Sequence, residues 1–274
     1  MEDWYHAHDL NMDIDCWNSL EDRVVYSTDL LLDLFDKYKT KATFFVLGCV
    51  AEKHPDLVRK IAAGGHEIGS HGYWHRMVCR QTREDFRDDL LSSKLLLEDL
   101  TGKEVNLYRA PSWSISGDSL WALEILEEEG FICDSSVQPF KTPLYGISGS
   151  PVIPFHPVIG GRRLKLVEFP PTVLTVGKIR VPFAGGLYFR ALPLWLIVQA
   201  LKRVNKTRPG MIYVHPWETD SGQPRISVSA IIKITHYLNL KKNLDKLERI
   251  LGYSNFVTLG NLIRGGVFPS FKVI

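Results

Sequence analysis

The period of the apolar positions changes repeatedly along this chain of 274 residues. Apolar residues recur at helical spacing over residues 24–39, form a continuous β-branched and aromatic run over 42–48, and return to helical spacing over 54–65. The stretch "HEIGSH" that follows has the composition of a strand. Because strand and helix patterns alternate at this spacing, the chain is predicted to form parallel βαβ units.

Later segments continue the alternation. Residues 82–102 predict a long helix with Thr82 as its N-cap and Gly102 just past its end. A further helix is expected in "SGDSLWALEILEEEGF". Further strands are expected in "VNLYRAP", "LKLVEFPPT", "MIYVHP" and "NFVTLGNLI".

These elements predict one α/β domain over residues 1–274, an open or imperfect barrel. Gln138–Val181 is rich in Pro and Gly, and we expect a loop-rich insertion there with a small antiparallel element. In such folds the chemistry lies at the C-terminal ends of the strands.

Composition narrows the function classes. Lys and Arg number 33 against 31 Asp and Glu, a net charge of +2, which gives no electrostatic case for nucleic acid or a membrane surface. The four cysteines form no CxxC pair, which argues against a thiolate zinc site. We expect no integral membrane segment, because no apolar run is long enough, and a cytoplasmic location, because the acidic N-terminus does not resemble a signal peptide.

Three histidines crowd the stretch "GGHEIGSHGYWHR". Side chains alternate along a strand, so His66 and His71 point to opposite faces, whereas His71 and His75 share a face if "HGYWH" begins a helical turn. Two imidazoles at this spacing suit a divalent metal such as zinc, with a carboxylate as third ligand and water in the open position. The alternative is a pair of packing or surface histidines.

Two further residues fall at predicted strand ends. Arg109 follows the strand in "VNLYRAP", and His215 ends the strand in "MIYVHP". Taken singly, Arg109 can form an ordinary ion pair at the surface, and His215 can cap the end of its strand. Together with His71 and His75, they would meet at one mouth of a barrel.

The sequence resembles the NodB-homology polysaccharide deacetylases, carbohydrate esterase family four, and within them the branch associated with exopolysaccharide biosynthesis and exosortase systems. The resemblance extends over almost the whole chain in family order. It rests on "EDWYH", "ATFFVLG", "GHEIGSHGYWH", "YRAPSWSI", "FICDSS", "VEFPPT", "GGLYFR" and "YVHPWE".

This resemblance implies a distorted (β/α) barrel, a divalent metal, usually Zn²⁺, and hydrolysis of N-acetyl groups from amino sugars of a polysaccharide or oligosaccharide. It implies that His71 and His75 are metal ligands, that Arg109 orients the catalytic carboxylate and that His215 is the general acid. Glu168 in "VEFPPT" is a candidate for orienting His215, with a strand-end ion pair as the alternative.

The chain departs from this family at its beginning, where relatives carry Asp-x-Glu-Asp-Trp at the end of a first barrel strand. Here the sequence starts "MEDW", so that aspartate and its strand are absent. A start assigned too late would make Glu2 a metal ligand and Asp3 a supporting residue. Alternatively, Glu2 replaces the base and Asp3 the ligand, or the chain is inactive.

Aromatic residues near the motifs suit a glycan groove, because sugar rings present apolar faces to aromatic rings. The candidates for substrate binding are Trp113, Tyr188, Arg190 and Trp217, with ordinary packing as the alternative. Two other functions remain open: hydrolysis of a small cyclic amide or imide on the same fold, and glycan binding without catalysis.

Overall fold

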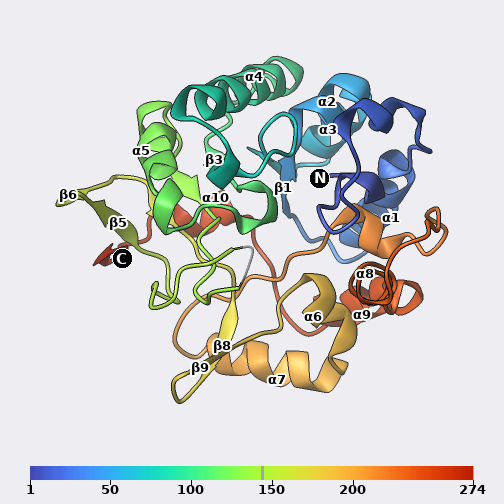
Figure 1. Ribbon diagram of the computed structural model, residues 1–274. Coiled ribbons are helices and arrows are strands. Elements are labelled where there is room, and N and C mark those ends of the chain that lie inside the picture. Colours follow the sequence, from blue (N-terminus) through green and yellow to red (C-terminus); the bar gives the residue numbers. More distant parts are fainter. Residues whose placement is uncertain (143–144, 274) are drawn as a thin grey trace. The chain divides into compact units, whose positions relative to one another are not determined.

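The computed structural model describes residues 1–142 and 145–273, and these form two compact units, each built from separate stretches of the chain (Figure 1). Unit 1 comprises residues 1–41 and 172–256, and unit 2 comprises residues 42–171 and 257–274. Within the described part of the chain, no helix has both the length and the apolar character needed to cross a bilayer.

Unit 2 contains a parallel sheet of five strands in the order β1-β2-β3-β4-β7. Its strands are β1 (Thr43–Val46), β2 (Glu67–Ser70), β3 (Leu107–Tyr108), β4 (Cys133–Asp134) and β7 (Val167–Glu168). The helices of this unit are α2 (Gly48–Lys53), α3 (Pro55–Ala63), α4 (Arg83–Thr101), α5 (Trp121–Glu128) and α10 (Leu259–Ile263). The alternation of parallel strands and helices confirms the predicted α/β fold class.

The boundaries of α4 follow its caps. The Thr82 side chain accepts a hydrogen bond from the Asp85 backbone N–H, and Gly102 ends the helix in the left-handed conformation with φ of 63°. Both residues were expected in these roles, because the N-cap and the glycine stop depend on local sequence alone.

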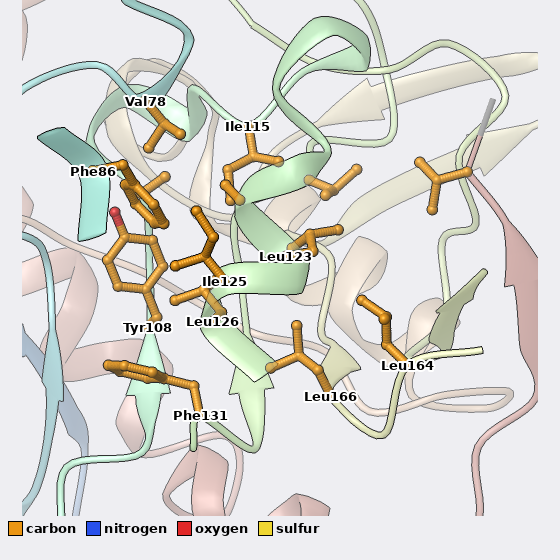
Figure 2. Close-up of a cluster of buried hydrophobic side chains, with 14 of the residues drawn as sticks. Val78, Phe86, Tyr108, Ile115, Leu123, Ile125, Leu126, Phe131, Leu164 and Leu166 are labelled. Atoms are coloured by element: carbon orange, nitrogen blue, oxygen red, sulfur yellow. The ribbon is translucent and has the colours of Figure 1, made fainter. Parts of the chain in front are cut away.

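The core of unit 2 lies between the sheet and the helices α4 and α5 (Figure 2). Phe86 of α4 meets Tyr108 of β3 edge-on at 5.8 Å between ring centroids, and Phe131 meets the same tyrosine at 6.0 Å. Leu123 and Leu126 of α5 belong to this cluster and are fully buried. The core therefore fixes the ends of β3 and β4.

A second sheet of unit 2 pairs β10 (Ser270–Lys272) in parallel with β5 (His156–Ile159), which pairs antiparallel with β6 (Arg162–Arg163). This antiparallel pair lies inside the region 138–181, where a small antiparallel element was expected; residues 143–144 of that region lie outside the described residues.

Unit 1 is mainly helical. It contains α1 (Val24–Lys37), α6 (Gly186–Ala191), α7 (Leu194–Val204), α8 (Ala230–Tyr237) and α9 (Leu240–Leu251). Its short 3₁₀ turns are η1 (Trp4–His6), η2 (Ile14–Ser19) and η6 (Pro216–Thr219). The strands β8 (Val173–Val176) and β9 (Ile179–Pro182) form an antiparallel hairpin.

Two expected strands are corrected. "NFVTLGNLI" contains the helix α10, because the Thr258 side chain caps its first turn by accepting from the Asn261 N–H. "MIYVHP" contributes only one isolated bridge, between Tyr213 and Gly185. The backbone N–H of Met211 donates to the Thr172 hydroxyl instead of to a neighbouring strand.

Candidate active site

His71 and His75 form the candidate metal pair of unit 2. His71 directly follows β2, at the C-terminal end of the strand, and its ring centroid is 5.2 Å from that of His75. Nδ1 of His71 lies 2.5 Å from the carbonyl oxygen of Arg109. Metal-binding histidines typically donate one ring N–H to a carbonyl, which fixes the tautomer and leaves the other nitrogen for the ion. The pair therefore fits a divalent metal.

The loop that carries His75 is irregular, and "HGYWH" forms no helical turn. Gly72 has φ of 77° and His75 has φ of 54°, both in the left-handed region. Asp89 of α4 holds this shape by accepting backbone N–H bonds from Tyr73 at 2.7 Å and Trp74 at 3.1 Å. A Cβ atom at residue 72 would lie 2.7 Å from the Asp89 carboxylate, so glycine is required there.

Arg109 follows β3 and is held by unit 2 itself. Its guanidinium donates to the Ser135 carbonyl at 3.2 Å and to the Ser135 hydroxyl at 3.0 Å. The same group lies over the rings of Phe45 and Trp113, 4.4 and 4.7 Å from their centroids. Trp113, a predicted substrate contact, is buried. Arg109 thus links the ends of neighbouring strands while its carbonyl orients His71.

Glu168 and Asp134 are register partners at the ends of β7 and β4, and both are completely buried. Two adjacent buried carboxyls cannot both ionise, so one keeps a proton at neutral pH. Burial, and then the charge of Asp134, raise the pKa of Glu168 well above its ordinary value. Ser136 donates its hydroxyl to Asp134 at 2.5 Å, which favours Asp134 as the ionised member.

His215 is the central residue of unit 1's polar cluster and is the N-cap of η6. Oε2 of Glu218 accepts from the backbone N–H of His215 and lies 2.9 Å from its Nδ1. Burial lowers the pKa of His215, but the charges of Glu218 and Glu2 outweigh this, and the net shift is upward. Glu218, and not the expected Glu168, is therefore the carboxylate that holds His215.

Arg190 completes this cluster, and its expected contact with substrate is corrected. It is 2 % exposed, and its Nε lies 2.8 Å from Oε1 of Glu218. The rest of the guanidinium donates to backbone carbonyls at the C-terminal end of α8, those of Thr235, His236 and the C-cap Leu238. All these donors are used inside unit 1, which leaves Arg190 no means to meet a sugar.

Burial raises the pKa of Glu218, but His215 and Arg190 overcome this effect and bring it to about 2. The sequence signal for Glu218 was its position three residues after His215, the spacing of a capping box. Arg190 precedes Glu218 by 28 residues, and no local pattern connects them.

Glu2 and Asp3 are both buried in unit 1 and have different neighbours. Oε1 of Glu2 lies 3.4 Å from Nε2 of His215 and accepts from the indole N–H of Trp217 at 3.3 Å. Asp3 instead accepts backbone N–H bonds from Trp4, Arg23 and Val24, which places its carboxylate at the start of α1. Asp3 has the geometry of a helix cap.

The remaining predicted substrate contacts differ in exposure. Trp217 is buried, stacked 4.3 Å from the ring of His236 at an interplanar angle of 2°, and packs as a core residue of unit 1. Tyr188 on α6 is exposed. Of the four predicted contacts, Tyr188 alone presents its ring to solvent.

The parallel strands with their helices define an α/β fold, and a histidine pair lies at the C-terminal end of one strand. Residues 17–129 match the family model described as polysaccharide deacetylase, and residues 135–264 match one described as a domain of unknown function. The match to the polysaccharide deacetylase model thus covers residues 17–129, which is less than half of the chain.

Individual proteins are also similar to this chain. A peptidoglycan deacetylase of Helicobacter pylori is 36% identical over 151 residues, which is 51% of this chain and 50% of that protein. The chain thus spans half the length of this relative. A solved structure described as a probable polysaccharide deacetylase from Pseudomonas aeruginosa PAO1 is 18% identical, with a TM-score of 0.58, over 87% of this chain and 71% of that chain. PuuE allantoinase, also 18% identical, has a TM-score of 0.57 over the same shares. These two structures share the fold.

Proposed function

We propose that the protein is a metal-dependent hydrolase that removes N-acetyl groups from amino sugars of a polysaccharide or of its precursor. The observation that carries this proposal is the pair His71 and His75, with His71 fixed by the Arg109 carbonyl, in the region that matches the polysaccharide deacetylase family model. The peptidoglycan deacetylase relative supports the same chemistry. Within this class we place the chain in the exopolysaccharide branch, on the motifs of its sequence.

His71 and His75 would hold the metal ion, and we assign Glu2 as the carboxylate ligand from the family resemblance. Asp3 is the weaker candidate, because its two oxygens already accept three backbone N–H groups. A bound divalent ion would supply a water activated near neutral pH and polarise the acetyl carbonyl. Zinc suits a site of two imidazoles and one carboxylate.

The chain's own residues supply the proton transfers. His215 is the proposed general acid for the leaving amine, and Glu218 holds its Nδ1, so that Nε2 is the nitrogen that presents the proton. Oε1 of Glu2 lies on that side of the ring, 3.4 Å from Nε2. Tyr188, with its exposed ring, is the proposed sugar contact of unit 1.

The first test is metal content. The purified chain should retain about one divalent ion and the His71→Ala variant almost none, because both imidazoles are needed to hold it. His156→Ala is the matched control, since its Nδ1 also lies near a backbone carbonyl, that of Leu166 at 3.1 Å, without belonging to the pair. Metal per chain is measured by mass spectrometry. Equal metal in all three proteins would contradict the assignment.

Acetate release from N-acetylglucosamine oligosaccharides is measured next. His215→Ala should keep its metal and lose roughly 100- to 10,000-fold in rate, the usual contribution of a general acid. Hydrolysis of allantoin-like amides in place of the oligosaccharides would identify the cyclic-amide alternative. Oligosaccharide binding without acetate release would identify a glycan-binding protein.

A further inference from the structure

The charges of the chain are strongly segregated in one segment of unit 1. Between Glu168 and Glu218 the sequence contains no Asp or Glu. Apart from Arg190, which is buried in its ion pair with Glu218, the same segment carries six cationic side chains: Lys178, Arg180, Lys202, Arg203, Lys206 and Arg208. The overall charge of +2 conceals this concentration, because the remainder of the chain is acidic. Such a segment attracts an anionic partner.

The β8–β9 hairpin in this segment has one entirely aliphatic face. Leu174 pairs with Val181 and Val176 pairs with Ile179, and cross-strand partners project to the same side. Val176, Val181 and Ile179 are exposed, the last at 68 %. A two-stranded ribbon that turns three aliphatic side chains to solvent has an unburied apolar surface of the kind that marks interaction sites.

Helix α7 packs beside this hairpin, and Figure 1 shows the two elements together in unit 1. Ile197 and Leu201 bury one side of the helix, while Trp195 on another side is 67 % exposed. The helix ends in the exposed pair Lys202 and Arg203. Aliphatic, indole and ammonium groups are thus presented by adjoining elements.

We propose that the β8–β9 hairpin and the exposed side of α7 dock unit 1 onto an anionic lipid surface. Aliphatic side chains and an indole enter the headgroup region, while surrounding lysines meet lipid phosphates. A carbohydrate or nucleic acid would leave Val176, Ile179 and Val181 without an apolar partner. A second copy of the chain would bring two acid-free cationic segments together, which like-charge repulsion opposes.

Vesicle co-sedimentation tests the proposal on the full chain. Vesicles of phosphatidylcholine alone are compared with vesicles that also contain phosphatidylglycerol, at low and high salt. The protein should bind the anionic vesicles, and added salt should weaken that binding. Lys178→Gln and Lys202→Gln should each weaken it about fivefold, as expected for one cation near a charged bilayer.

Ile179→Ser and Trp195→Ser test the apolar part and should each weaken binding about tenfold, the effect of withdrawing one large side chain from lipid. Ile231→Ser is the matched control, because Ile231 is also in unit 1 and is 75 % exposed but lies on α8. Circular dichroism confirms that each variant is folded. Hydrolysis of a soluble oligosaccharide should be unchanged, which separates this proposal from that of the catalytic function.

Several results would overturn the proposal. Equal binding to both vesicle types would contradict docking onto an anionic lipid surface. Binding by Ile179→Ser as strong as that of the parent protein would contradict docking through the hairpin. Binding to the anionic polysaccharide heparin but not to vesicles would identify a glycan surface. A dimer in sedimentation velocity that Ile179→Ser dissociates would identify a second copy of the chain as the occupant.

Discussion

Glu218 in unit 1 and Glu168 in unit 2 are equally buried, at 1 % and 0 % exposure, yet they differ in charge. Glu218 lies between the His215 ring and the Arg190 guanidinium, and its pKa falls to about 2 despite its burial. Glu168 lies against Asp134, and its pKa is raised by burial and then by that second carboxyl.

This difference teaches that the neighbours, and not the depth of burial, decide the charge of these glutamates. Desolvation favours the neutral acid in both cases. Only Glu218 has cationic partners close enough to reverse it. The charged Glu218 can hold His215 and stabilise the protonated form of its ring. A protonated Glu168 instead holds the carboxyl of Asp134 beside it.

The largest effect on stability is expected for the Glu218→Ala variant. This variant leaves the Arg190 guanidinium buried without its carboxylate, and we expect a loss of about 3–5 kcal/mol in the free energy of unfolding. Urea unfolding measures it. Glu248→Ala is the control, because Glu248 pairs with Lys37 at the surface and its removal should have no measurable effect. Similar losses in the two variants would contradict the assignment.

The same carboxylate predicts an acid-side dependence. A group whose pKa falls from 4.5 to about 2 on folding stabilises the folded state above pH 4.5, and this contribution disappears as the pH falls toward 2. The loss in the free energy of unfolding caused by Glu218→Gln, measured by urea unfolding, should therefore become smaller as the pH is lowered. A cost that stays constant from pH 7 to pH 3 would count against an ionised Glu218.

The Glu168→Gln variant tests the opposite pH dependence of stability, the one caused by Glu168. Because folding raises the pKa of Glu168, its contribution is present below its ordinary value of 4.5 and is lost as the pH rises toward the folded value. Parental stability should fall by about 1.4 kcal/mol per pH unit in that window, and the amide variant should remove this slope. Unfolding measured from pH 5 to pH 9 tests this. An unchanged slope would show that Glu168 is already ionised.

The smallest expected effect is that of Ser136→Ala. The Ser136 hydroxyl donates to Asp134 and accepts from the Ala110 backbone N–H at 2.7 Å, so its removal should cost about 1–2 kcal/mol. It should also raise the pKa of the carboxyl pair, because the ionised form of Asp134 loses a donor. A stability curve that moves to lower pH instead would contradict this placement.

Much of the fold could be predicted because its signals are local. Thr82 and Gly102 mark the ends of α4 by themselves, and the run at residues 42–48 is apolar enough to identify β1. The apolar run around Thr258 predicts a strand, but it forms α10, because so short a run has no clear period and the Thr258 side chain caps a helical turn there.

In the candidate site, too, residues close together in the sequence could be predicted and contacts between distant residues could not. His71 and His75 were recognised because they are close in sequence and follow a strand. The ties of Glu218 to Arg190, and of Glu168 to Asp134, join residues far apart in the chain, and only folding reveals them. The segment before His75 forms no helical turn, because Asp89, on a different element, accepts hydrogen bonds from the N–H groups of that loop.

The interleaving of the two units sets an order for biosynthesis. Unit 1 can be completed only after residues 172–256 have been synthesised, although residues 1–41 are made first. Likewise, β5 can pair with β10 only after the end of the chain has been made. At ordinary rates of translation the ribosome needs roughly 6–26 s to make residues 42–171. During that time α1 emerges without η6, its partner in residues 172–256, so a chaperone that shields apolar segments should raise the yield of folded protein.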